Sequence, residues 1–100
     1  MVKHIVCWNF KDQAHGMDKA ALKKEAKRQL EALPALISEI KAFQVGENIS
    51  TRPVAMNLAL VSEFESMDSL QAYAQHPEHV AVAEWIKDAV IETRVVDYEF

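Results

Sequence analysis

The order in which hydrophobic side chains change their spacing restricts the fold of this chain more than any other feature. Apolar residues are spaced as in β-strands over four segments, residues 2–10, 40–48, 56–64 and 93–100. Helical spacing occurs between the first two strands and again before the last one. The order strand, helix, strand, strand, helix pair, strand is that of the split βαβ, or ferredoxin-like, arrangement. The sequence therefore predicts an α+β fold, βαββαβ, with a four-stranded antiparallel sheet and all helices on one face.

Caps and prolines give the bounds of the helices. The three predicted helices are residues 19–36, 67–75 and 77–91. Asp18 and Ser66 are typical N-cap residues for the first two, and the first helix is expected to break near Pro34. Pro77 disfavours helical geometry in the residue before it and suits the first position of a helix. The last two helices are therefore expected to be separate.

Length and composition indicate one domain, residues 1–100, with half of its side chains apolar. Acidic side chains outnumber basic ones by 15 to 11, and a net charge of −4 argues against nucleic acid or an anionic membrane as partner. Cys7 is the only cysteine, so no disulfide can form within the chain. The first residues contain no apolar run long enough for a signal peptide or a membrane span. These features favour a cytoplasmic protein.

Both faces of the predicted sheet carry apolar side chains. Successive residues of a strand alternate between faces, so Val6 and Trp8 lie on one face of the first strand and Ile5 and Cys7 on the other. Helices in this order cover one face only, and a sheet face exposed to water is expected to be polar. We therefore expect the uncovered face to pack on the same face of a second copy, which predicts a homodimer.

Six segments, in this order and spacing, carry a resemblance to a known family. They are "KHIVCWNFKD", "LEALPAL", "FQVGEN", "LALVSEFES", "MDSLQAYAQHPEHVAV" and "VVDYEF". The most diagnostic part is the histidine, proline, any residue, histidine step inside "AYAQHPEHV". The chain resembles the stress-responsive dimeric α/β-barrel (Dabb) family, most members of which have no assigned reaction. The resemblance implies a ferredoxin-like subunit whose sheet pairs with that of a second subunit to form a barrel.

One branch of this family is enzymatic. It contains plant polyketide cyclases similar to olivetolic acid cyclase, which close a ring by intramolecular aldol condensation of a linear polyketide thioester. The resemblance implies that Tyr73 and His79 match their tyrosine and histidine, and that His4 matches a further histidine of the pocket. Ala26 stands where such cyclases have a tyrosine, and Leu58 where they have a histidine. Both departures remove polar groups from the inferred pocket.

The spacing of Tyr73 and His79 adds a physical argument for a site. Six residues on an unbroken helix correspond to about 240° around its axis, so these side chains converge only if the helix breaks at Pro77. In the first turn of a new helix, the positive end of the dipole favours a neutral imidazole at position 79. We expect His79 to act as a base on a carbon next to a carbonyl, and Tyr73 to donate a hydrogen bond to the developing oxyanion. His4 is expected to face them from the sheet, and this chemistry needs no cofactor.

The pocket is expected to have apolar walls and to suit a small apolar or aromatic ligand. The predicted wall residues are Val6, Trp8, Leu58 and Leu60. A structural interpretation exists for each polar candidate, since His4 and Tyr73 can also be core residues with anchored polar atoms, and His76 is most simply a helix cap. His76 and His79 are too few ligands for a metal site, so no metal is expected.

Three functions stay open on these residues. The first is a homodimeric Dabb-domain protein of unassigned role with a small-molecule pocket between sheet and helices. The second is a polyketide cyclase-like lyase, and the third is a structural or stress-protective oligomer. The volume left between the bulky side chains of the pocket separates a ligand-binding protein from a structural one.

Overall fold

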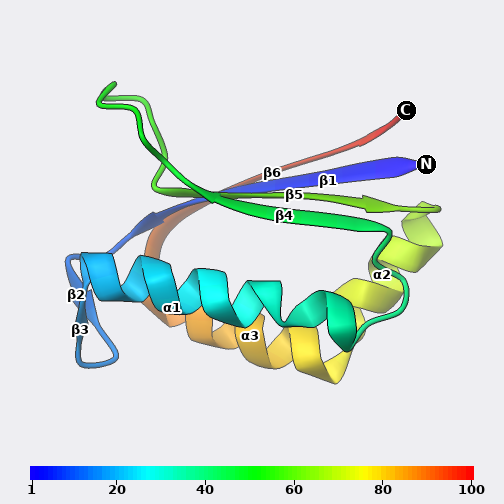
Figure 1. The fold of residues 1–100 in the computed structure, drawn as a ribbon, viewed down its shortest axis with the longest axis horizontal. Helices are drawn as coiled ribbons and strands as arrows, with labels where there is room; N and C mark the ends of the chain where they lie inside the picture. The colour runs from blue at the N-terminus through cyan, green and yellow to red at the C-terminus, as the bar shows by residue number, and fades with distance from the viewer.

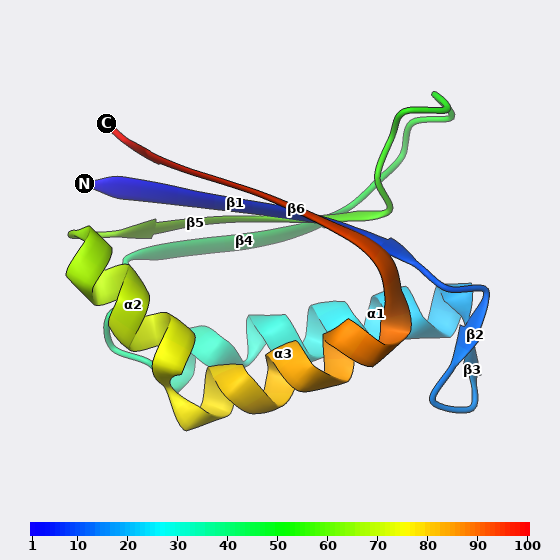
Figure 2. The same ribbon diagram turned by 180° about the vertical axis from the view of Figure 1, so that it is seen from behind.

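The computed structural model describes residues 1–100 and confirms the ferredoxin-like α+β fold (Figure 1). The elements in chain order are β1 Val2–Phe10, β2 Gln13–Ala14, β3 Met17–Asp18, α1 Lys19–Glu31, η1 Leu33–Ala35, β4 Ala42–Glu47, β5 Leu58–Phe64, α2 Met67–Gln75, α3 Pro77–Ala89 and β6 Val90–Glu99. Four strands form one antiparallel sheet in the order β4, β5, β1, β6. The helices all lie on one side of this sheet, which gives two layers (Figures 1 and 2).

The first two helices begin at the predicted caps. The Asp18 side chain accepts a hydrogen bond from the Ala21 backbone N–H, and the Ser66 side chain accepts one from Ser69. The predicted break near Pro34 is present: α1 ends at Glu31, and a separate 3₁₀ turn, η1, contains Pro34. Proline has no N–H to continue the α-helical ladder, which explains the change.

The boundary between α3 and β6 differs from the prediction. The helix was expected to reach residue 91 and the strand to begin at residue 93, but the chain passes from Ala89 directly into β6 at Val90. Val90 already pairs with Phe10 of β1, and a bulge at Asn9 and Phe10 adjusts the register. Pairing with a long neighbouring strand therefore overrides the local helical pattern in the last residues of the helix.

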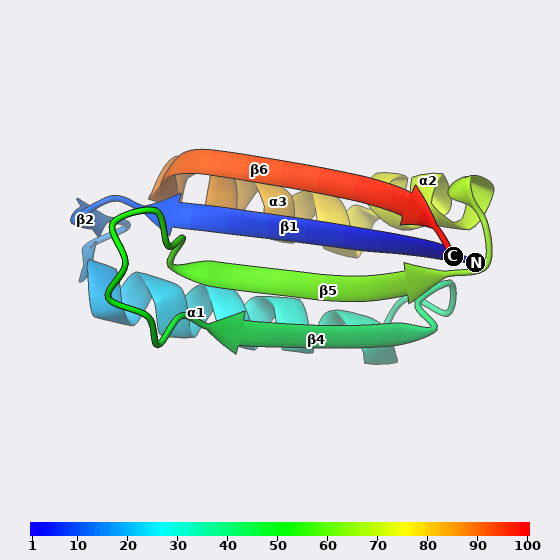
Figure 3. The same ribbon diagram turned by 90° about the horizontal axis from the view of Figure 1, so that it is seen from above.

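The connection between β4 and β5 rises away from the helical layer (Figures 1 and 3). The strand predicted over 56–64 begins at Leu58, because Asn57 makes hydrogen bonds with its side chain as well as its backbone. Its side-chain carbonyl accepts from the Phe10 N–H at 2.8 Å, and its own N–H donates to the Trp8 carbonyl at 2.9 Å. The strand ladder therefore starts one residue after this junction.

A short hairpin, β2 and β3, was not predicted. Its two strands have two residues each, and its turn places His15 and Gly16 at φ angles of 50° and 72°. Both angles are left-handed, which glycine adopts freely and other residues rarely do. A strand of two residues is too short to show alternation of apolar and polar side chains, so the sequence of this segment indicated a polar loop.

The core lies between the sheet and the helices. Tyr73, Phe10 and Phe64 are the largest of its fully buried side chains. On the opposite face of the sheet, Ile5 pairs with Val61 on one side and Val96 on the other, so an apolar row crosses three strands. No helix covers this face, which is the near one in Figure 3. None of the helices is both long and apolar enough to cross a membrane.

Candidate functional site

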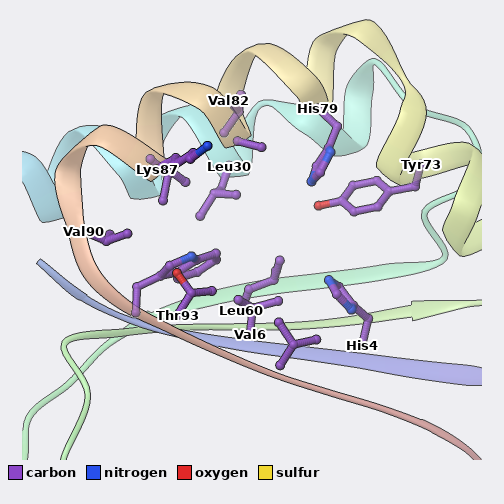
Figure 4. Close-up of a pocket in the computed structure, with 14 residues that line it drawn as sticks. His4, Val6, Leu30, Leu60, Tyr73, His79, Val82, Lys87, Val90 and Thr93 are labelled. Atoms are coloured by element: carbon purple, nitrogen blue, oxygen red, sulfur yellow. The ribbon is translucent and has the colours of Figure 1, made fainter.

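A cavity of about 310 Å³ lies between the sheet and the helices, on the side of α3 and β6 (Figure 4). Fourteen residues line it: His4, Val6, Trp8, Leu30, Leu60, Tyr73, His79, Val82, Ala83, Ile86, Lys87, Val90, Thr93 and Val95. Ten of them are hydrophobic. The volume is at the small end of the range for ligand pockets, roughly 300 to 1,000 Å³, and an apolar wall with a few polar groups is typical of such pockets.

The structure places six of the seven predicted site residues on this wall and leaves Leu58 out. Leu58 is only 1% exposed and belongs to the packed core. Leu60, two residues further along β5 and on the same face, does line the cavity. Leu58 therefore lies outside this cavity, because alternation identifies the face of a strand but not which side chains of that face border a cavity.

His79 is held as a neutral base. Its Nδ1 lies 3.0 Å from the Ala74 carbonyl oxygen. A carbonyl only accepts hydrogen bonds, so Nδ1 carries the proton and the neutral ring keeps a free lone pair on Nε2. Burial lowers the pKa of His79, the nearby imidazoles of His4 and His76 act in the same direction, and the bond to Ala74 opposes them. The balance favours the neutral form.

Tyr73 places an unpaired hydroxyl at the same end of the cavity. The residue is 1% exposed, and its hydroxyl oxygen has no hydrogen-bond partner. Burial raises the pKa of Tyr73 well above the usual value of about 10, so the phenol stays protonated. Its ring centroid lies 4.4 Å from that of His79, and Figure 4 shows the hydroxyl directed into the cavity beside the imidazole.

The break at Pro77 explains how these two rings meet. His76 has extended geometry between α2 and α3, and Pro77 is the first residue of α3. The His76 side chain accepts a hydrogen bond from the Glu78 N–H at 3.1 Å, so it is the N-cap of α3, as expected. The turn at this junction brings the side chains of Tyr73 and His79 together at the cavity.

His4 forms a pair with Asp97 that sequence reasoning missed. Nδ1 of His4 lies 2.5 Å from Oδ1 of Asp97, and the two residues are direct partners across β1 and β6. The carboxylate orients the ring so that its other nitrogen is free, as in many enzyme sites. The ring lies 6.2 Å from that of Tyr73, in an edge arrangement. The only available signal was the alternation of β6, which is of no use until the register against β1 is known.

A second cavity of about 200 Å³ lies beside the first. It shares His4, Tyr73 and His79 with the larger cavity and is also lined by Asp97 and by residues of α2, including Gln71. The three aromatic side chains therefore stand between two hollows. No group of three His, Cys, Asp or Glu side chains is close enough together to hold a metal ion.

Comparisons with known proteins place this chain in a family. Residues 2–100 match the stress responsive A/B barrel domain family, Dabb. An uncharacterised protein of Streptomyces coelicolor is 32% identical over 101 residues, which is 100% of both chains. A dimeric protein of unknown function from Bacteroides fragilis, with a ferredoxin-like fold, is 39% identical, with a TM-score of 0.87 over 99% of this chain and 95% of its own.

One further solved structure is an enzyme. The hydroxynitrile lyase from Passiflora edulis has a TM-score of 0.83 over 97% of this chain and 90% of its own. It is 20% identical to this chain, so the likeness shows the fold alone.

Proposed function

The chain belongs to the stress-responsive A/B barrel (Dabb) family, and from this premise we propose that it is a homodimeric enzyme that removes a proton from a carbon next to a carbonyl. The substrate is a small molecule with an apolar body, bound between the sheet and α3. His79 is the base, and Tyr73 donates a hydrogen bond to the oxyanion that forms. His4, oriented by Asp97, faces them from the sheet.

The unpaired Tyr73 hydroxyl is the observation that carries this proposal. A buried hydroxyl without a partner costs roughly 1 to 3 kcal/mol, so native structures rarely keep one without a use for it. This hydroxyl is directed into a cavity, next to an imidazole whose free nitrogen can accept a proton. A carbonyl oxygen bound in the cavity would satisfy this donor, which supports a ligand-binding role for Tyr73.

The reaction follows from these positions. Nε2 of His79 takes a proton from the carbon next to the carbonyl, and the electron pair of the broken C–H bond moves to form an enolate. The Tyr73 hydroxyl donates to the enolate oxygen and stays protonated, because burial raises its pKa. The enolate then attacks a second carbonyl of the same molecule in an aldol ring closure, and the imidazolium returns its proton to the new alkoxide.

The cavity bears on the size of the substrate. Ala26 and Leu58, which stand where the plant cyclases have polar residues, are fully buried and do not line the cavity. The polar groups at the end of the cavity where Tyr73 lies are therefore those of His4, Tyr73 and His79. A volume of about 310 Å³ favours a ligand with one ring or a short chain over a long polyketide.

The homodimer is proposed to form through the uncovered sheet face. The apolar row of Ile5, Val61 and Val96 supports this contact, because such a row is unfavourable in water. The Bacteroides fragilis protein is dimeric, as are other solved structures of this fold. The cavity lies on the other side of the sheet, so every proposed catalytic group comes from one subunit.

Deuterium exchange tests the chemistry. Phenylacetone, a small neutral ketone, is incubated with the protein in D₂O, and loss of its proton signals next to the carbonyl is followed by ¹H NMR. We expect the wild type to accelerate the exchange, and His79→Gln and Tyr73→Phe each to lower the rate by about a hundredfold or more. His15→Gln is the matched control, because His15 does not line the cavity. Equal rates for wild type and His79→Gln refute the proposal.

The pH dependence of exchange is a second readout of the same experiment. Because the pKa of His79 is lowered, the rate should rise with pH below the ordinary imidazole value of about 6.5 and be constant near neutral pH. Because the pKa of Tyr73 is raised, the rate should not fall as the pH passes about 10, where a free phenol ionises. A rise only above neutral pH contradicts the assignment of His79.

A further inference from the structure

The end of the cavity opposite Tyr73 contains a cation without an anionic partner. Lys87 lies in the last turn of α3 and lines the cavity. The six ion pairs of the structure all use other basic side chains. Figure 4 shows the Lys87 side chain beside α3, well separated from the Tyr73 and His79 end. Lys87 is exposed, so its ammonium group is open to an anion that is bound at this wall.

Thr93 provides a second polar group at this end. It is the partner of Trp8 across β1 and β6, and like Trp8 it lines the cavity from the sheet. Lys87 stands on the helix side and Thr93 on the sheet side of the same end of the cavity (Figure 4). An ammonium donates up to three hydrogen bonds and a hydroxyl donates one, which together suit the two oxygens of a carboxylate.

The rest of the wall separates the two polar ends. The side chains between them are apolar and include Val6, Leu60, Val82 and Ile86. The protein carries a net charge of −4, so its overall field does not attract anions, and an effect of Lys87 on binding must be local. The cavity therefore has one end for proton transfer, an apolar middle and one end with a single positive charge.

We infer that Lys87 and Thr93 form a carboxylate subsite, and that the substrate is a small diketo acid, whose second carbonyl is the one that the enolate attacks. Its carboxylate lies between the two side chains, its apolar body fills the middle of the cavity, and its enolisable carbonyl lies at Tyr73 and His79. This inference rests on the proposed function for the carbonyl end only. The inference of a carboxylate site depends only on the positions of Lys87 and Thr93.

Calorimetry with a matched pair of ligands tests the subsite. 4-Acetylbenzoate and 4-acetylbenzamide share an enolisable acetyl group at one end of an apolar ring and differ in the charge at the far end. We expect wild type to bind the acid about three- to tenfold more tightly than the amide, as a partly exposed charge pair allows. Lys87→Met should abolish this preference without weakening the amide, and Lys87→Arg should keep it. Lys24→Met on α1 is the matched control, because Lys24 is exposed like Lys87 but lies outside the cavity.

The outcomes separate the two proposals. Equal binding of acid and amide by wild type, or an acid preference that survives Lys87→Met, overturns the subsite. The proposed function still stands in that case if exchange of phenylacetone requires His79. An acid preference that depends on Lys87, without exchange on any ketone, supports the subsite and overturns the proton abstraction. If neither ligand binds, the subsite fails, and the proposed function is decided by the exchange of phenylacetone alone.

Discussion

Tyr73 is the residue at which stability and function predict opposite effects. Replacing the hydroxyl in Tyr73→Phe removes a buried group without a partner, so the free energy of unfolding should be unchanged or rise by up to about 1 kcal/mol. The same variant should lose the exchange activity. Urea unfolding followed by circular dichroism measures the stability. A loss of more than about 1 kcal/mol shows that the hydroxyl makes a structural hydrogen bond.

At the residue scale, the sequence indicated the candidates but not all of their partners. Tyr73 and His79 could be named because a proline between them is visible in the chain. Asp97 could not, since its contact with His4 depends on the register of two strands that lie far apart in the sequence. Lys87 could not be singled out either, because its place at the cavity depends on how α3 lies over the sheet.

At the scale of elements, the junction between α2 and α3 depends on the His76 cap. His76→Ala removes the acceptor of the Glu78 N–H and should lower the free energy of unfolding by about 1 kcal/mol. His76→Asn should restore most of this loss, because asparagine is a good N-cap, and should keep the exchange activity. Urea unfolding and the exchange assay check both expectations. Loss of activity in a stable His76→Asn variant contradicts a purely structural role for His76.

The helices illustrate how far local signals reach. Asp18, Ser66 and Pro77 stand at the starts of the three helices, where the chain alone predicted them. The ends were less predictable. The break near Pro34 was predicted, but β6 begins at Val90, inside the predicted third helix, where it pairs with β1.

At the scale of the whole molecule, the uncovered sheet face should control assembly. Val96 is 58% exposed in the isolated chain and lies in the apolar row. Val96→Asp should convert the dimer to a monomer, because a carboxylate in an apolar contact is strongly unfavourable. Leu36→Asp is the matched control, since Leu36 is 52% exposed but belongs to the helical layer. Size-exclusion chromatography with light scattering measures the mass, and a Val96→Asp dimer refutes this interface.

The sequence by itself determined the order of the elements, the helix starts and the two-faced sheet. These properties depend on spacing and caps within a few residues, where the physical causes are local. The sequence also determined that the Tyr73 and His79 side chains can meet, because the helix break between them is a local property of Pro77.

Only the tertiary structure decided which side chains share the cavity. It left Leu58 in the core and off the cavity wall, joined Asp97 to His4, and brought Lys87 and Thr93 to the same cavity. These contacts depend on strand register and on which helix covers which strand. Both are set by packing across the whole sheet, because contacts between distant segments leave no periodic mark in the chain.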